Sequence, residues 1–219
     1  MNPSTLLLLA ALPVHAAAAC PTSRFTLDSQ PTVYTSAPTG SGCYFGPNYI
    51  GFNESCLSFS IPAGNLYGTV ETSVDASASA RIVVVDNFDL VGVPPGPTAH
   101  LLVNLALDGY VPFVNHEPHG SVYGAIQDSM GHGVDTGPYS TSLNTTLTLP
   151  EDFIAGQPFP LTFSISVGCY GDAYGTLDGT ISFSNVPLQA SVVSCNGYVS
   201  NPVVASKPTS WGKLKALYR

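Results

Sequence analysis

The sequence predicts an all-β fold: a two-sheet antiparallel sandwich of jelly-roll kind, with about eight or nine strands. First, apolar or small side chains occupy every second position from residue 70 to 82, which indicates one buried and one wet face. Second, similar alternating segments recur along the chain with turn residues between them. Third, only 9% of the residues are charged, while glycine and proline number 21 and 19. That composition favours short strands joined by turns over a helical bundle.

The alternation also predicts where the individual strands lie. The expected strands, in chain order, are residues 24–36 with a break at Pro31, then 57–61, 70–82, 88–92, 101–107, 143–149, 161–169, 177–183 and 192–195. Residues 70–82 are expected to form one long strand, and the polar pair Asp86-Asn87 to break the chain before the next. Pro94-Pro95-Gly96-Pro97 must turn the chain, because proline cannot donate to a ladder and glycine accepts positive φ.

The two ends of the chain differ from its body. Residues 1–19 read as a signal peptide, with an apolar core from Leu6 to Val14 followed by small residues of the A-x-A kind. Residues 20–200 form the β-sandwich domain, and residues 201–219 a basic amphipathic tail that is helical or disordered. No apolar run is long enough for a transmembrane helix. The expected location is therefore extracytoplasmic, secreted or at the cell surface.

Charge is distributed unevenly along the chain. Residues 1–200 carry all fourteen carboxylates and only two basic side chains, Arg24 and Arg81, for a net charge of −12. The last nineteen residues carry the other four basic side chains and no acidic one. A body this acidic repels phosphates, so the sequence argues against nucleic acid as a partner.

Five cysteines suit an oxidising compartment. The economical pairing joins Cys43 to Cys56 and Cys169 to Cys195, although the sequence does not choose among the possible pairings. Cys20 directly follows Ala19 and is a candidate for the lipid-bearing first residue of a lipoprotein. The alternative is a third structural or free thiol.

Aromatic residues concentrate between Cys43 and Cys56, whose expected disulfide closes a loop. They are Tyr44, Phe45, Tyr49 and Phe52. Aromatic rings on a rigid exposed loop would stack on sugar rings, which makes these residues the candidate glycan-binding set. The alternative is that they plug one end of the sandwich.

Residues 110–140 form the least regular stretch and hold most of the histidines. The candidate ligands for copper or zinc are His100, His116, His119, Met130 and His132. Their spacing matches no known metal motif, and the alternative is a solvated polar loop. Near strand ends, a structural calcium ion has candidate ligands in Asp86, Asp89, Asp172 and Asp178, with solvated surface carboxylates as the alternative.

Motifs for catalysis are sparse. Asp135-Thr136-Gly137 matches the triplet of aspartic proteases, but no second such triplet completes a dyad. The sequence contains no Gly-x-Ser-x-Gly elbow, no Ser-x-x-Lys and no phosphate-binding glycine loop.

A resemblance rests on three stretches: residues 86–92 with Pro94-Pro95-Gly96, residues 183–187 leading into 192–198, and the terminus from Trp211 to Arg219. These resemble uncharacterised secreted bacterial β-sandwich proteins with a short basic Trp/Tyr-Arg C-terminal tail. Some of those are similar to β domains found before bacterial surface-sorting tails. The resemblance implies a bacterial extracytoplasmic setting and assigns no catalytic or binding residue. This chain departs from sorting tails in lacking a hydrophobic span and a Leu-Pro-x-Thr-Gly signal.

Two functional hypotheses follow. The first is an exported non-enzymatic module with a structural, adhesive or carbohydrate-binding role. The alternative is an exported metal-binding protein or metalloenzyme that uses His116, His119 and His132. Convergence of the imidazoles on one point would favour the second hypothesis, and their scattering the first.

Overall fold

The computed structural model describes residues 20–28, 30–48, 51–73, 76–114, 117–137 and 140–200. The expected signal peptide and C-terminal tail lie outside these residues, as do Tyr49 and His116. All regular elements in the described ranges are β-strands, and no helix there could cross a membrane. The all-β prediction is confirmed.

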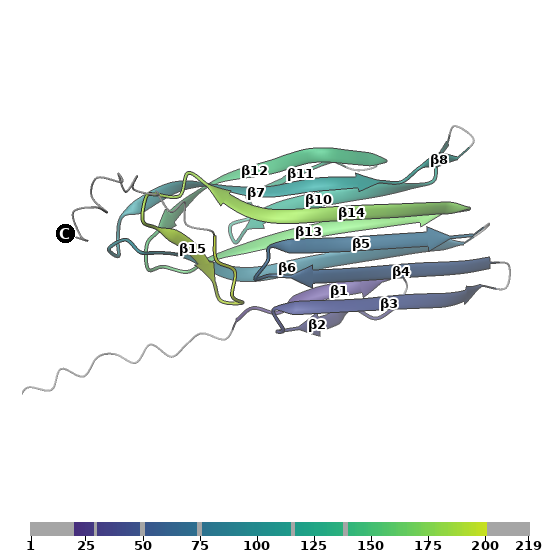
Figure 1. Cartoon of the computed structure of the whole chain (residues 1–219), viewed down its shortest axis with the longest axis horizontal. Helices are drawn as coiled ribbons and strands as arrows, with labels where there is room; N and C mark the ends of the chain where they lie inside the picture. The colour runs from purple at the N-terminus through teal and green to yellow at the C-terminus, as the bar shows by residue number, and fades with distance from the viewer. Residues whose placement is uncertain are drawn as a thin grey trace, which may run out of the picture.

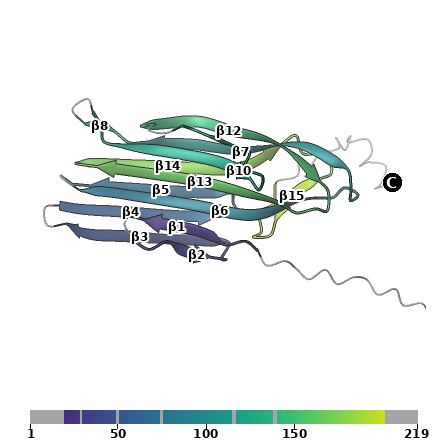
Figure 2. The ribbon, with the colours of Figure 1, turned by 180° about the vertical axis from the view of Figure 1, so that it is seen from behind.

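The strands form two sheets that face each other across one core, and a small separate ribbon (Figures 1 and 2). The seven-stranded sheet has the order β11 (Gly133–Asp135), β10 (Gly120–Asp128), β13 (Phe159–Tyr170), β6 (Ser77–Val91), β1 (Ser23–Leu27) and β2 (Val33–Thr35), and β15 (Ser191–Ser194) also pairs with β6. The six-stranded sheet has the order β12 (Ser142–Ile154), β7 (Thr98–Tyr110), β14 (Ala173–Ser184), β5 (Asn65–Thr72), β4 (Gly51–Ser60) and β3 (Thr39–Asn48). The ribbon pairs β8 (Phe113–Val114) with β9 (Glu117–Pro118).

Eight of these strands have jelly-roll topology. Leaving the ribbon aside, β5 to β14 pair as a nested set: β5 with β14, β6 with β13, β7 with β12, and β10 with β11, all antiparallel. Nested pairing of this kind is that of a long hairpin folded over into two sheets, which is the jelly roll. The expected architecture is therefore confirmed. The remaining strands extend both sheets, so the total exceeds the eight or nine expected.

Residues 70–82 do not form one strand, contrary to the prediction. β5 ends at Thr72 in the six-stranded sheet, and β6 begins at Ser77 in the seven-stranded sheet. The alternation continues across the crossover: Val70, Ala78 and Ile82 are all buried. Both sheets point their inward side chains into the same core, so the pattern hides the change of sheet.

The expected polar break at Asp86-Asn87 is also wrong, because β6 runs without interruption through both residues. Asp86 faces the interior and is fully buried. Its carboxylate accepts hydrogen bonds from the backbone N–H of Asn87 (2.8 Å) and from the backbone N–H and side-chain amide of Asn196 (3.3 and 3.2 Å). Burial raises the pKa of Asp86, and the hydrogen bonds from Ser194, Asn87 and Asn196 oppose the rise. This buried carboxyl group therefore fixes the turn that follows β15.

The stretch 110–140 is more regular than predicted. It contains β10, a nine-residue strand that lies between β11 and β13 within the seven-stranded sheet. Val122 and Ile126 point into the core, while glycine occupies the inward position between them. A Cβ on that residue, Gly124, would lie 2.4 Å from Leu107 Cδ1 of the facing sheet. The weak hydrophobic pattern therefore reflects close packing between the sheets.

One predicted disulfide is present and the other is wrong. Cys43 and Cys56 are directly opposite each other on β3 and β4 and are bonded, as expected. The expected loop between them is a regular hairpin of two ten-residue strands. Cys195 is bonded to Cys20 instead of Cys169, which is a buried free thiol. Two disulfides agree with an oxidising compartment.

The register explains the Cys20–Cys195 bond. β1 and β15 pair along the same edge of β6, and both cysteines reach that edge near Asn87, whose carbonyl accepts the Cys195 N–H (2.9 Å). Cys169 pairs with Ala78 of β6. Ala78 lies nine residues from Asn87 along this strand, a distance of roughly 30 Å. Cysteines this far apart cannot be bridged. Because a lipid thioether would need the same sulfur atom, lipidation of Cys20 and this disulfide exclude each other.

Candidate functional site

The outer surface of the six-stranded sheet carries a row of polar side chains from four adjacent strands. Tyr67 on β5 pairs with Asp178 on β14, Asp178 pairs with Asp108 on β7, and Asp108 pairs with Asn144 on β12. All four are exposed, because they alternate with core residues such as Leu66 and Leu177. Neighbouring strands lie about 4.8 Å apart, so the row spans roughly 15 Å of the surface.

Two further tyrosines lie on the same surface. Tyr174 on β14 and Tyr110 on β7 are 48% and 53% exposed. With Tyr67, Asp108 and Asp178 they define what we call the acidic tyrosine face. The strands that carry it are central in the sheet and are joined to neighbours on both sides, so its side chains stand on a rigid support.

Electrostatics distinguish the members of this face. Burial raises the pKa of Asp178, and the neighbouring Asp108 adds to the rise. Burial also raises the pKa of the Tyr67 phenol, with smaller contributions from Tyr174 and Asp178. Like charges placed directly opposite on neighbouring strands are unfavourable in the free protein. The pairing of Asp108 with Asp178 therefore favours a ligand that donates hydrogen bonds to both carboxyl groups.

A surface hollow of about 410 Å³ lies beside these carboxyl groups. Its lining includes Asp108, Asp178, Asn144, Thr146 and Thr180. The two carboxylates accept hydrogen bonds, the threonine hydroxyls both donate and accept, and the amide does both with different atoms. Such a set matches a ligand rich in hydroxyl groups, while the tyrosine rings offer flat apolar surfaces.

The predicted aromatic set is only partly exposed. Phe45 and Phe52 are 66% and 49% exposed, whereas Tyr44 is half-buried and packs against the core. Phe45 pairs with Glu54, Glu54 pairs with Glu71, and Glu71 pairs with Tyr174. Phe45 therefore belongs to the same outer surface as the acidic tyrosine face, at the edge of the sheet. Glycan binding by these aromatics stays a prediction.

The predicted histidine site does not form as proposed. His119 precedes β10 and His132 follows it, so at about 3.3 Å per residue they lie roughly 25–30 Å apart. His119 stacks on Tyr170 with ring centroids 5.1 Å apart, and its Nδ1–H donates to the Tyr170 carbonyl (3.0 Å). One metal ion cannot bind both imidazoles. The proposed set of His116, His119 and His132 is therefore wrong in pairing the last two.

His132 and His100 each pair with an aspartate. His132 Nδ1 lies 2.9 Å from the buried carboxylate of Asp128, and His100 Nδ1 contacts Asp152. His100 and Met130 line one hollow of about 350 Å³, together with Glu151 and Asp152. Burial raises the pKa of Glu151, and the neighbouring Asp128 adds to this effect. The structure thus brings His100 and Met130 together and leaves His119 at the other end of the sandwich.

The candidate calcium ligands are dispersed. Asp86 points into the core from the seven-stranded sheet, while Asp178 lies on the outer surface of the six-stranded sheet. Asp89 accepts a hydrogen bond from the Gly156 N–H (3.0 Å). Asp86 and Asp178 therefore cannot share an ion. Within the described ranges, the one group of three clustered ligand-type side chains is Cys43, Glu54 and Cys56, whose sulfurs are already bonded to each other.

Four of the five members of the acidic tyrosine face were not identified from the sequence, and the fifth, Asp178, was identified only as a candidate calcium ligand. The signal that pointed to them was the identity of the polar residues in alternating strands: Tyr67 between Leu66 and a glycine, and Asp178 between Leu177 and another glycine. Alternation shows that such residues face outward. Which of them meet depends on the register between β5, β14 and β7.

No family model matches the chain, and no curated protein sequence matches it. Among solved structures, it is similar to a carbohydrate-binding module in complex with β-1,4-galactotriose (13% identity, TM-score 0.31, covering 66% of this chain and 89% of the other). It is also similar to carbohydrate-binding modules of the β-sandwich superfamily (10% identity, TM-score 0.27, 75% and 85%). A third is the enzymatically active domain of bacteriophage CBA120 tailspike protein 4 (10% identity, TM-score 0.26, 73% and 19%). Likenesses this distant carry no argument about function.

Proposed function

We propose that this chain is an exported, non-enzymatic binding module that holds a neutral glycan on the acidic tyrosine face. One observation carries the proposal: the row Tyr67–Asp178–Asp108–Asn144, with two carboxyl groups side by side and exposed tyrosines around them. Sugar hydroxyls satisfy the paired carboxyl groups, and the C–H faces of the rings lie against the tyrosines. A neutral glycan suits this surface because an anionic one would be repelled by Asp108 and Asp178.

Export is supported by the leader-like residues 1–19, by the two disulfides and by the resemblance to secreted bacterial proteins. The open position of the carboxyl groups supports a binding role over a catalytic one. Both project side by side from one exposed sheet face, whereas the two carboxyl groups of a glycosidase flank the scissile bond.

Isothermal titration against neutral polysaccharides (galactan, xylan, mannan and β-glucan) tests the proposal. At least one should bind saturably. Tyr67→Ala and Asp178→Asn should each weaken that binding by about 1–2 kcal/mol, a factor of about 5–30 in affinity. Tyr34→Ala is the matched control, because Tyr34 is an exposed tyrosine on the opposite sheet and should leave the affinity unchanged.

Two results would contradict the proposal. Binding to none of the polysaccharides would remove the glycan role. Release of reducing ends from a bound polysaccharide, lost in Asp178→Asn, would show that the carboxyl pair is catalytic, since two carboxyl groups about 5 Å apart are the arrangement of retaining glycosidases.

A further inference from the structure

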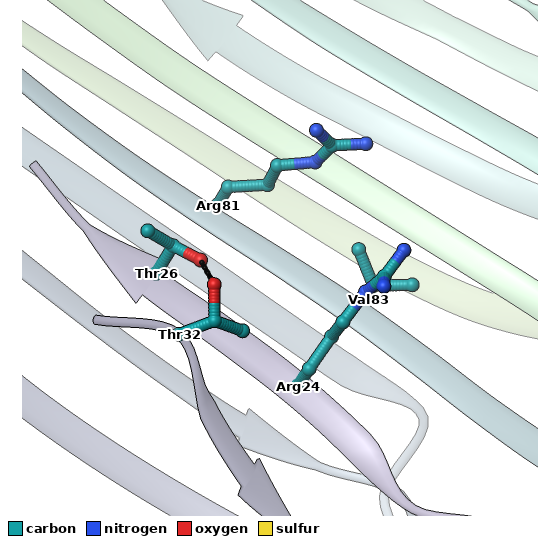
Figure 3. Close-up of a pocket in the computed structure, with 5 residues that line it drawn as sticks. All are labelled: Arg24, Thr26, Thr32, Arg81 and Val83. Carbon is teal, nitrogen blue, oxygen red and sulfur yellow. Dashed lines mark hydrogen bonds between the residues drawn. The ribbon is translucent and has the colours of Figure 1, made fainter. Parts of the chain in front are cut away.

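The two arginines of the β domain meet on the outer surface of the seven-stranded sheet, on the opposite side of the sandwich from the acidic tyrosine face. Arg24 on β1 pairs with Val83 on β6, and Thr26 pairs with Arg81. Arg24 and Arg81 are therefore diagonal neighbours on one surface. Figure 3 shows both side chains rising from adjacent strands, with Thr26, Thr32 and Val83 between and beside them.

These five residues line a hollow of about 220 Å³. The Thr26 and Thr32 hydroxyls share a hydrogen bond of 3.0 Å, and each keeps further capacity to bind another group. Val83 is buried and forms an apolar wall. The hollow thus combines two guanidinium groups, two hydroxyls and one apolar side chain.

Neither guanidinium has an acidic partner in the described part of the chain, where the ion pairs are those of His100 and His132. This is unexpected for a domain in which carboxylates outnumber arginines fourteen to two. Two carboxylates share this surface: Asp89, eight residues from Arg81 along β6, and Asp135 on β11. Tyr123 lies between Arg81 and Asp135, so Asp135 raises its pKa and Arg81 lowers it. Asp28, which follows β1 beside Ser79, accepts a hydrogen bond from the Asn53 side-chain amide (2.9 Å), so among the described residues no carboxylate forms an ion pair with either arginine.

Two like charges that are diagonal neighbours repel each other, and nothing in the described residues neutralises them. An oxyanion would. Guanidinium groups bind carboxylate, sulfate and phosphate oxygens through paired N–H donors, and Arg suits such recognition better than Lys. Hydroxyls supply the additional donors that a multi-oxygen anion accepts.

We propose that the hollow formed by Arg24, Arg81, Thr26 and Thr32 binds a single oxyanion group, the carboxylate or sulfate ester of an acidic saccharide. The volume is below the roughly 300–1,000 Å³ of pockets that enclose a whole drug-sized molecule, so the hollow takes one charged group while the rest of the ligand lies along the sheet. That neighbouring surface suits a saccharide, because β13 presents the hydroxyls of Ser164 and Ser166 beside Val83 and Arg81.

The test uses ¹⁵N-labelled full chain and four probes: tetragalacturonate for the carboxylate, a sulfated galactan tetramer for the sulfate ester, neutral galactotetraose, and sodium sulfate. Either acidic saccharide should shift the side-chain N–H signals of Arg24 and Arg81 saturably, whereas the neutral one should not. The tighter of the two acidic saccharides identifies the oxyanion. Arg24→Gln and Arg81→Gln should each weaken binding about tenfold or more.

Gln157→Glu is the matched control. It changes the net charge by the same amount as Arg→Gln, in the exposed turn between β12 and β13, and should leave the affinity within about twofold. Tyr67→Ala should also leave it unchanged, so failure of this site and failure of the glycan face are distinguishable. The proposal is overturned if neither acidic saccharide binds saturably, if sodium sulfate binds as tightly as both, or if the arginine variants bind as tightly as the parent chain.

Discussion

Removal of the Cys20–Cys195 disulfide should destabilise the domain more than removal of Cys43–Cys56. The first bond joins residues 175 apart in sequence and the second joins residues 13 apart. In the chain-entropy relation, these loops restrict the unfolded chain by about 18 and about 10 cal/mol/K, which is about 5 and about 3 kcal/mol at 25 °C. The expected difference in the free energy of unfolding is therefore about 2 kcal/mol.

Denaturation by guanidinium chloride measures this difference in two double variants, Cys20→Ser/Cys195→Ser and Cys43→Ser/Cys56→Ser. In thermal unfolding, the same 2 kcal/mol corresponds, for a domain of this size, to a gap of roughly 4–8 °C in Tm between the variants. Peptide mapping without reduction checks the connectivity first: Cys20 and Cys195 should appear in one linked pair, and Cys169 should react with a thiol reagent only after unfolding, because it is buried.

A larger loss from the Cys43–Cys56 variant would refute the loop-closure reasoning. It would mean that the hairpin of β3 and β4 depends on its bond for local structure. A linked Cys169–Cys195 peptide would refute the register along β6 itself, since that register places Cys169 and Cys195 at opposite ends of the strand.

Two further predictions concern stability. Burial raises the pKa of Asp86 and Glu151, so the folded state holds these two protons more tightly than the unfolded state. Their protonation therefore contributes to the stability of the folded state. That contribution is fully present below about pH 4 and is lost as the pH rises through the raised pKa values. The melting temperature should therefore be higher at about pH 4.5 than at pH 7, and Asp86→Asn should reduce the difference; a melting temperature that falls on acidification contradicts this. A Cβ on Gly120 would lie 2.0 Å from the Gly168 carbonyl oxygen, so Gly120→Ala should cost about 1–3 kcal/mol in urea unfolding. Gly168→Ala, whose nearest atom would be 3.5 Å away, should cost less than about 0.5 kcal/mol, and equal losses would exclude the steric cause.

The fold class was predictable because alternation is a local property. Ala78, Ala80 and Ile82 point inward whichever strand lies beside them, so the pattern predicts a pleated strand with one buried face. The boundary between β5 and β6 was not predictable, since inward residues of both sheets enter the same core. The prediction of a break at Asp86 was wrong because it depended on a distant contact. The carboxyl group of Asp86 is buried within β6, where Asn196, far away in sequence, donates hydrogen bonds to it.

The candidate site depended more strongly on distant contacts. Phe45 and Phe52 were identified because they cluster in sequence, whereas Tyr67, Asp108 and Asp178 come from three strands and meet only through their registers. The histidines show the converse, because His119 and His132 are close in sequence but are separated by the length of β10. Proximity in sequence is a poor guide to proximity in a sandwich, where a strand carries the chain across the whole molecule.

By itself, the sequence determined that this chain folds into antiparallel strands around an apolar core. It also determined that the body is acidic, with two basic residues that lie far apart in sequence. Periodicity and charge are local quantities that can be read without knowing which strands pair. Only the tertiary structure decided which cysteines are bonded, where the tyrosines and carboxyl groups meet, and that Arg24 and Arg81 share one hollow. Those outcomes depend on the registers between strands, and a register is set by the packing of both sheets at once.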